Sequence, residues 1–282
     1  MTRTARATDA VLPASEWRAL LAHASGWSPV QVLTRSIDEL EAGARARFEQ
    51  LVDARRRGEP IAYLTGVREF HSRPFVVDRR VLIPRHETEH LVEIAIAAVR
   101  ARGTTPTPVL DLGTGSGILA ITLALECPNA RVVATDRSAD ALAVARANAD
   151  RLGAAVDWRE GSWYRALADG ERFDVIVSNP PYIAHDDPHL DDGDLRFEPR
   201  VALTDGDDGL GALAAIVGEA SAHLRPGGLL AVEHGFDQGG ATRRLFEVAG
   251  FHAITGHRDL AGLDRVTEGT WPAPDSNTAA DL

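Results

Sequence analysis

The most telling local pattern of the sequence is Val109-Leu110-Asp111-Leu112-Gly113-Thr114-Gly115-Ser116-Gly117, an apolar run that enters a glycine-rich turn. Glycine has no side chain, so it lets the backbone turn tightly and approach a ligand closely. The spacing is G-x-G-x-G, which differs from the G-x-G-x-x-G of dinucleotide-binding turns. A strand, a glycine turn and a helix in this order predict a nucleotide-type site. A purely structural tight turn is the alternative interpretation.

The residues on both sides of this turn alternate between strand-like and helical patterns. Strands are expected at residues 108–112, 131–135, 173–178 and 229–233. Helices are expected at residues 89–100, 118–126, 139–152 and 210–224. This alternation predicts a doubly wound α/β sheet with right-handed crossovers. Two further runs, residues 252–257 and 264–270, predict an antiparallel hairpin at the sheet edge.

The N-terminal part of the chain has helical patterns instead. A helix is expected to begin at Ser15, a second at Ser28-Pro29 with Gln31 completing its cap, and a third to cover residues 35–57. Strand-like residues 69–77 and 81–83, separated by Asp78-Arg79-Arg80, predict a hairpin that links two domains. We therefore expect four segments: a helical domain (1–67), a hairpin linker (68–85), an α/β domain (86–271) and a disordered tail (272–282).

The bulk composition limits the possible partners. A chain of 282 residues is long enough for one large domain and a smaller one. The net charge of −11 argues against a protein that binds duplex DNA or membrane surfaces, because such proteins usually carry a positively charged surface. The single cysteine, Cys127, excludes an intramolecular disulfide, and the N-terminus lacks the apolar segment of a secretory signal. We expect a cytoplasmic protein that neither spans a membrane nor binds nucleic acid stably.

A second pattern, Asn179-Pro180-Pro181-Tyr182, follows the strand expected at residues 173–178. Proline lacks a backbone N–H and has φ fixed near about −65°, and the residue before it is extended. The turn is therefore stiff and offers carbonyl acceptors, one amide side chain and one aromatic ring. Such a surface suits a planar –NH2 group, because both N–H bonds can be accepted while the ring covers the flat face. The pattern indicates chemistry on an amide or amino nitrogen.

The glycine turn, Asp136 and the Asn-Pro-Pro-Tyr turn together resemble class I S-adenosylmethionine-dependent methyltransferases. Asp136 ends the strand after the glycine turn, at a distance suited to both hydroxyls of a ribose. The resemblance implies a Rossmann-like fold, S-adenosyl-L-methionine as cofactor and S-adenosyl-L-homocysteine as product. Ser162 stands where the family often has Asp, and a serine can still bind the adenine. The implied cofactor-binding residues are Gly113, Thr114, Gly115, Ser116, Gly117, Asp136, Trp163 and Asn179.

Longer segments resemble the protein-(glutamine-N5) methyltransferases of peptide chain release factors, the HemK or PrmC family. The match runs in order from Gly58 to Gly269, and its main segments are residues 60–70, 82–89, 187–190, 193–199, 233–235, 258–259 and 264–267. This resemblance implies methylation of the glutamine in the Gly-Gly-Gln motif of bacterial class I release factors 1 and 2. The helical domain would then bind the release factor, and the enzyme is expected to be a monomer.

The resemblance implies that Asn179, Pro180 and Tyr182 are catalytic and that Pro181 completes the substrate-binding turn. An amide nitrogen is a poor nucleophile because its lone pair is delocalised into the carbonyl. The Asn179 side-chain oxygen and the Pro180 carbonyl are expected to accept one N–H each, while Tyr182 stacks on the amide plane. The sulfonium leaving group provides the driving force, so no general base is assigned.

Several alternatives stay open. A ribosomal-protein glutamine methyltransferase and an adenine-N6 nucleic-acid methyltransferase also use this turn, and a binding module without activity is a third interpretation. The acidic charge argues against a nucleic-acid substrate. His86-Glu87-Thr88-Glu89-His90 satisfies the H-E-x-x-H pattern of zinc hydrolases, in which both histidines share one helix face. No third-ligand segment follows, so no metal is expected.

Overall fold

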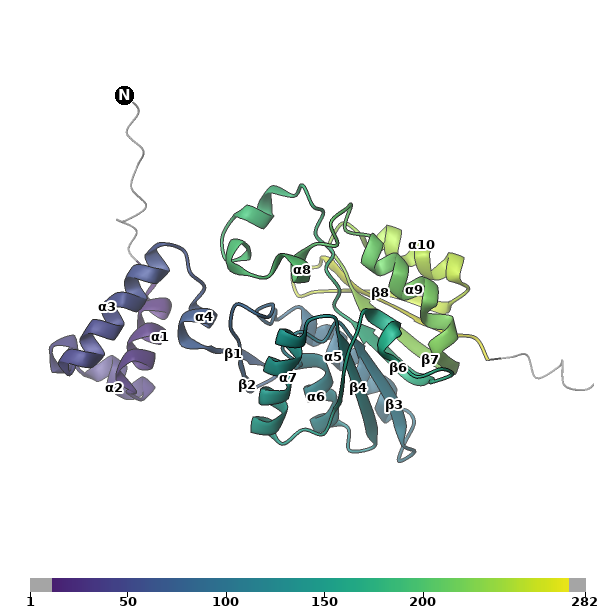
Figure 1. Cartoon of the computed structure of the whole chain (residues 1–282), viewed down its shortest axis with the longest axis horizontal. Coiled ribbons are helices and arrows are strands. Elements are labelled where there is room, and N and C mark those ends of the chain that lie inside the picture. Colours follow the sequence, from purple (N-terminus) through teal and green to yellow (C-terminus); the bar gives the residue numbers. More distant parts are fainter. Residues whose placement is uncertain (1–11, 274–282) are drawn as a thin grey trace, which may run out of the picture.

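The computed structural model describes residues 12–273, and Figure 1 shows their arrangement in chain order. The N-terminal part contains α1 (Ala14–Ser25), α2 (Pro29–Thr34), the 3₁₀ turn η1 (Ile37–Glu39), α3 (Ala42–Arg56) and α4 (Ile61–Thr65). The predicted cap of α2 is confirmed, because Ser28 and Gln31 form a capping box. The prediction of a single helix over residues 35–57 is wrong. A second capping box, Ser36 with Glu39, starts η1, and the extended Leu40 separates that turn from α3.

A small hairpin follows the N-terminal helices. Strands β1 (Val67–Phe70) and β2 (Arg73–Val76) pair antiparallel around His71 and Ser72. These two residues have φ of 48° and 59°, the left-handed values that a two-residue hairpin turn needs. The predicted hairpin around Asp78-Arg79-Arg80 is therefore wrong in position: the chain reverses earlier, and residues 81–83 form no strand.

The central sheet has seven strands in the order β5-β4-β3-β6-β7-β9-β8. The chain forms β3 to β5 on one side and then crosses to β6 on the other. Neighbouring strands are parallel except where β9 pairs with β7 and with β8. The hairpin predicted at the sheet edge is therefore confirmed. The strands are β3 (Thr107–Leu112), β4 (Ala130–Asp136), β5 (Asp157–Glu160), β6 (Phe173–Ser178), β7 (Leu224–Glu233), β8 (His252–Arg258) and β9 (Asp264–Thr270).

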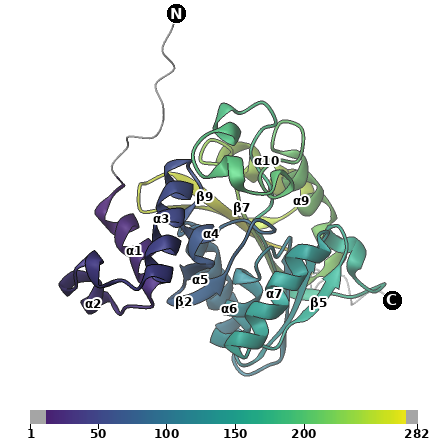
Figure 2. The same ribbon diagram turned by 60° about the vertical axis from the view of Figure 1, so that its left-hand side comes forward.

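Helices cover both faces of the sheet, as Figures 1 and 2 show. One face packs against α5 (Thr88–Arg100), α6 (Ile118–Glu126) and α7 (Ala139–Leu152). The other packs against α9 (Gly211–His223) and α10 (Gly239–Ala249). Alternate strand residues serve the two faces: Val109 lies in the first core and Leu110 in the second. This doubly wound architecture confirms the predicted fold class.

The connection between β6 and α9 is long and contains three short helical pieces. Figure 1 shows this connection above the sheet. These are η3 (Pro188–Asp191), η4 (Leu195–Phe197) and α8 (Arg200–Leu203), while η2 (Trp163–Ala166) follows β5. None of the described helices is long and apolar enough to cross a membrane. The domain limits at residues 67 and 85 stay predictions, and residues 274–282 of the predicted disordered tail lie outside the described residues.

Candidate active site

The two sequence patterns meet at the carboxyl ends of neighbouring parallel strands. Leu112 of β3 is in register with Thr135 of β4 on one side and with Ser178 of β6 on the other. The next residues along these strands bring the glycine turn, Asp136 and Asn179 to one edge of the sheet. Strands β4 and β5 are added on one side of β3, and β6 is added on the other side. Ligands of open α/β sheets bind at the point where the strand order reverses in this way.

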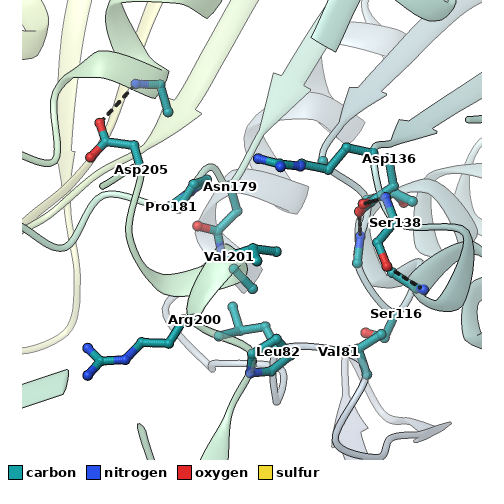
Figure 3. Close-up of a pocket in the computed structure, with 18 of the residues that line it drawn as sticks. Val81, Leu82, Ser116, Asp136, Ser138, Asn179, Pro181, Arg200, Val201 and Asp205 are labelled. Carbon is teal, nitrogen blue, oxygen red and sulfur yellow. Dashed lines mark hydrogen bonds between the residues drawn. The ribbon is translucent and has the colours of Figure 1, made fainter. Parts of the chain in front are cut away.

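A cavity of about 830 Å³ opens at this edge. Figure 3 shows Asn179 and Pro181 on one side of it and Asp136 and Ser138 on the other. Three predicted site residues, Gly117, Pro180 and Tyr182, are not among those that line it. The predicted residues that do line it are Gly113, Thr114, Gly115, Ser116, Asp136, Trp163, Asn179 and Pro181.

The glycine turn has a geometry that only glycine fits well. Gly113 has φ of 73°, and a Cβ added there would lie 3.1 Å from the Trp163 ring. Trp163 itself has φ of 50°, a left-handed conformation that is costly for a bulky side chain. The close packing of Gly113 against Trp163 therefore shapes the wall where the adenine is expected.

Asp136 holds the glycine turn as well as the edge of the cavity. Its Oδ2 accepts the Gly115 N–H at 2.9 Å, and its Oδ1 accepts the Ser138 N–H at 2.9 Å. Burial raises the pKa of the Asp136 carboxyl, while these two hydrogen bonds act in the opposite direction. Each carboxylate oxygen has a second lone pair, so the side chain can still accept hydrogen bonds from two ribose hydroxyls.

Asn179 is held by a residue that the sequence analysis did not single out. Its Nδ2 donates to Thr88 Oγ1 at 3.1 Å, and Thr88 is fully buried at the start of α5. In this arrangement the Thr88 hydroxyl acts as the acceptor for the amide NH2. With its NH2 group directed at Thr88, the Asn179 side chain keeps its oxygen as an acceptor.

The hydroxyl group of Tyr182 points away from the cavity. Its hydroxyl donates to Glu233 Oε1 at 3.2 Å, and its ring packs against the core under α9 and α10. Burial raises the pKa of the Tyr182 hydroxyl, and the negative charge of the neighbouring Glu233 raises it further. Stacking of Tyr182 on a substrate amide therefore stays a prediction, whereas its contact with Glu233 is a feature that the sequence did not reveal.

Comparisons with known proteins identify the family. The model of the PrmC N-terminal domain matches residues 4–66, and that of the methyltransferase small domain matches residues 93–192. The chain is 52% identical to the release factor glutamine methyltransferase of Burkholderia pseudomallei, with 93% of each chain covered. It is 42% identical to that of Escherichia coli, with 92% of each covered. The chain belongs to the release factor glutamine methyltransferase family.

Members of this family are enzymes that use S-adenosylmethionine. This chain is therefore a methyltransferase with S-adenosylmethionine as its cofactor. The fold agrees with the family. A methyltransferase structure from Pyrococcus furiosus superposes with a TM-score of 0.54 at 17% identity, and covers 83% of this chain and 100% of its own. A ribosomal protein L11 methylase from Lactobacillus delbrueckii gives 0.50 at 21% identity over 70% of this chain and 84% of its own. At these identities the likeness concerns the fold alone.

A buried carboxyl supports the glycine turn of this methyltransferase. Asp111 lies fully buried beneath the glycine turn, where its Oδ2 accepts the Thr114 hydroxyl at 2.6 Å and the Ala120 N–H at 3.2 Å. Its Oδ1 has no hydrogen-bond partner among the described protein atoms. Burial raises the pKa of Asp111 to about 7. Asp111 does not line the cavity and instead holds the glycine turn from beneath through Thr114 and Ala120.

The opposite wall of the cavity is held by a buried ion pair. Glu198 is 5% exposed, pairs with Arg85, and accepts the Ile83 N–H at 3.0 Å. Burial raises the pKa of Glu198, and the charge of Arg85 opposes that shift. Pro199, Arg200, Val201 and Ala202 come next along the chain, and all of them line the cavity. The pair thus joins the segment after β2 to the long connection after β6.

The zinc pattern does not form the arrangement that it requires. Helix α5 begins at Thr88, so His86 precedes the helix and its side chain is 70% exposed. Within residues 12–273, no group of three or more His, Cys, Asp or Glu side chains is placed to hold a metal ion. His86 therefore lies outside the helix on which a zinc site of this pattern would need both His86 and His90.

Proposed function

We propose that this methyltransferase transfers a methyl group to the side-chain amide N5 of the glutamine in the Gly-Gly-Gln motif of bacterial class I release factors. The observation that carries the proposal is the Asn179 amide. Its NH2 end is occupied by Thr88 at 3.1 Å, and its acceptor end is left for a substrate at the edge of the cofactor cavity.

Each wall of the cavity would hold one part of the cofactor. The glycine turn, residues 113–117, would bind the methionine portion, and the buried Asp111 would support this turn through Thr114. Asp136 would bind the ribose, and Trp163 with Ser162 would face the adenine. The bound cofactor supplies a methyl group on a sulfonium, which is a strong electrophile with a neutral leaving group.

The Asn-Pro-Pro-Tyr turn would bind the glutamine amide. The Asn179 oxygen and the Pro180 carbonyl would accept one N–H each, and the Pro181 ring would complete the wall beside them. Positive charge develops on the amide nitrogen during the transfer. Acceptors that are already oriented toward this nitrogen stabilise the charge without reorganisation, which is a large term in catalysis. No side chain is needed as a general base, because the proton that is lost is acidic once the nitrogen carries the methyl group.

The release factors recognised would be release factors 1 and 2, bound through the N-terminal helices by a monomeric, cytoplasmic enzyme. The long connection after β6 supports this arrangement. It contacts the N-terminal helices through Asp194 and the cavity through Pro199, so both surfaces are joined by one segment. The net charge of −11 favours a protein substrate over a nucleic acid.

Labelled methyl transfer tests this proposal. Purified release factor, ribosomal protein and DNA are each incubated with the enzyme and cofactor under the same conditions. We expect label on the release factor alone. Label on the ribosomal protein or on adenine, with none on the release factor, would refute the proposed substrate while leaving the methyltransferase family intact.

A further inference from the structure

Glu233 is a buried carboxyl for which the transfer reaction as described has no role. It ends β7, directly beside the Asn-Pro-Pro-Tyr turn, since Val232 is in register with Ser178 of β6. The residue is 1% exposed. Its Oε1 accepts the Tyr182 hydroxyl at 3.2 Å, while its Oε2 has no hydrogen-bond partner among the described protein atoms. Burying an incompletely bonded carboxyl is costly, so it requires an explanation.

Thr88 connects this carboxyl to Asn179. The Thr88 hydroxyl accepts an N–H of the Asn179 amide at 3.1 Å. It also favours the ionised form of Glu233, although no hydrogen bond joins the two side chains in this structure. A hydroxyl that accepts one hydrogen bond keeps its own proton to donate. Both side chains are buried, so water does not compete for this proton. Glu233 therefore meets two members of the substrate turn, Tyr182 directly and Asn179 through Thr88.

We propose that Glu233 is a positioning residue for methyl transfer, which orients the Asn179 amide through Thr88 and fixes Tyr182 through its hydroxyl. The inference rests on the proposed function, because it assigns to the Asn179 oxygen the task of accepting a substrate N–H. It adds two residues, Glu233 and Thr88, that touch neither the cavity nor the reacting atoms.

The charge of Glu233 sets the direction of the whole chain of hydrogen bonds. An ionised carboxylate only accepts, so the unpartnered Glu233 Oε2 can bind the Thr88 hydroxyl only by accepting its proton. Thr88 Oγ1 is then an acceptor, and the Asn179 amide must present its NH2 to Thr88 and its oxygen to the substrate. A protonated Glu233 can donate to Thr88 instead. Thr88 can then donate to the Asn179 oxygen, which turns the amide NH2 toward the substrate NH2, where it repels.

The surroundings place this change of charge near neutral pH. Burial raises the pKa of Glu233 to about 7. The hydroxyls of Thr88 and Tyr182 and the charge of Arg265 favour the ionised form, whereas Glu87 opposes it. Glu233 is therefore expected to ionise as the pH rises through about 7, and the competent orientation of Asn179 is expected to appear in the same range.

A matched pair of variants at Thr88 tests the connection. Thr88→Val keeps the shape but removes the hydroxyl, and Thr88→Ser keeps the hydroxyl. We expect kcat for release factor methylation to fall by about 10- to 100-fold in Thr88→Val, which is somewhat less than the loss of a direct transition-state contact. Thr88→Ser should restore most of it. Calorimetric affinity for S-adenosylhomocysteine should stay within about threefold of the parent enzyme in both, because neither residue binds the cofactor.

Glu233→Gln tests the role of the charge through the pH profile. The parent enzyme should gain kcat as the pH rises through about 7, and Glu233→Gln should have a lower kcat without this rise. A parent-like kcat in Thr88→Val, or an unchanged rise in Glu233→Gln, would overturn the inference. Should Glu233→Gln fail to fold, the Thr88 pair decides alone. An enzyme whose parent form does not methylate release factor refutes the proposed function instead, so the two failures are distinguishable.

Discussion

The Asp136 carboxylate accepts the Gly115 N–H at 2.9 Å and so ties the end of β4 to the glycine turn that follows β3. The other oxygen of the same carboxylate holds the Ser138 N–H at the start of α7. The side chain expected to bind the ribose thus also sets the shape of the turn that is expected to bind the methionine portion. Loss of this carboxylate should therefore affect both halves of the cofactor.

Asp136→Ala should weaken the binding of S-adenosylhomocysteine by about 10- to 100-fold, the equivalent of one or two hydrogen bonds to a charged group. Isothermal titration calorimetry measures the change. Asp150→Ala is the matched control, because Asp150 is an exposed aspartate on α7. Equal affinities in the parent and Asp136→Ala would remove Asp136 from the cofactor site.

Asn179→Ala should lower kcat by at least about 100-fold, since it removes an acceptor that is oriented toward the charge developing on the amide nitrogen. Cofactor affinity should stay close to that of the parent enzyme, because the glycine turn and Asp136 are untouched. Single-turnover transfer to release factor measures the first effect and calorimetry the second. Near-normal turnover by this variant is incompatible with the role given to Asn179.

The contribution of Asp111 to the stability of the cofactor-free protein should fall as the pH rises from about 4 to about 7. Burial raises the pKa of Asp111 to about 7, and an aspartate in an unfolded chain titrates near about 3.9. Between these values the folded state binds more protons than the unfolded state, so the free energy of unfolding decreases with pH. Glu233 acts in the same direction, and the lowered pKa of His234 acts in the opposite one.

Asp111→Asn isolates this contribution. A neutral side chain removes up to about 1.4 kcal/mol of pH dependence per pH unit in that range. Thermal unfolding between pH 5 and about pH 7.5 should thus show a shallower slope in the variant than in the parent protein. Parallel slopes would mean that Asp111 is already ionised in the folded protein.

Arg55 should stabilise the contact between the N-terminal helices and the long connection after β6. Its guanidinium donates twice to Glu16 of α1, at 2.8 Å each, and once to Asp194 at 3.2 Å. Arg55→Ala should lower the free energy of unfolding by on the order of 1–2 kcal/mol, since the pair is only partly screened by solvent. Chemical denaturation measures this loss.

Arg56→Ala provides the comparison for Arg55→Ala. Arg56 is the next residue on α3, and within residues 12–273 it forms an ion pair with the exposed Asp53 alone, at 3.5 Å. An exposed pair of this kind contributes little, so this variant should unfold like the parent protein. Equal stabilities in the two variants would show that the Arg55 contacts do not hold the helices against the connection.

The elements best predicted from the sequence are those with clear local signals at both ends. The helices at residues 118–126 and 139–152 have the predicted limits, because Gly117 and Ser138 cap their starts and Gly153 ends the second. Strand β5 and helix α10 were not predicted. In β5 (Asp157–Glu160) three of the four residues are charged, and the strand exists because it pairs with β4 at the sheet edge.

The candidate site was predictable where one local motif supplies the residues and unpredictable where distant segments meet. The glycine turn, Asp136 and Asn179 are recognisable because each stands at the carboxyl end of a strand. Thr88 gives no such signal, since it lies 91 residues from Asn179 and meets it only through the fold. Glu233 likewise becomes recognisable only through its contact with Tyr182, which lies 51 residues away in the sequence. The hairpin around His71 and Ser72 was misplaced because its turn lacks the Asn-Gly or Asp-Gly pair that usually marks two residues with positive φ.

The most direct test of the account is peptide mass spectrometry of unmethylated release factor after incubation with the enzyme and S-adenosylmethionine. The account predicts one added methyl group, located by fragmentation on the side-chain amide of the Gly-Gly-Gln glutamine, and its absence when Asn179→Ala replaces the parent enzyme. A methyl group on any other residue, or the same modification with Asn179→Ala, would contradict it.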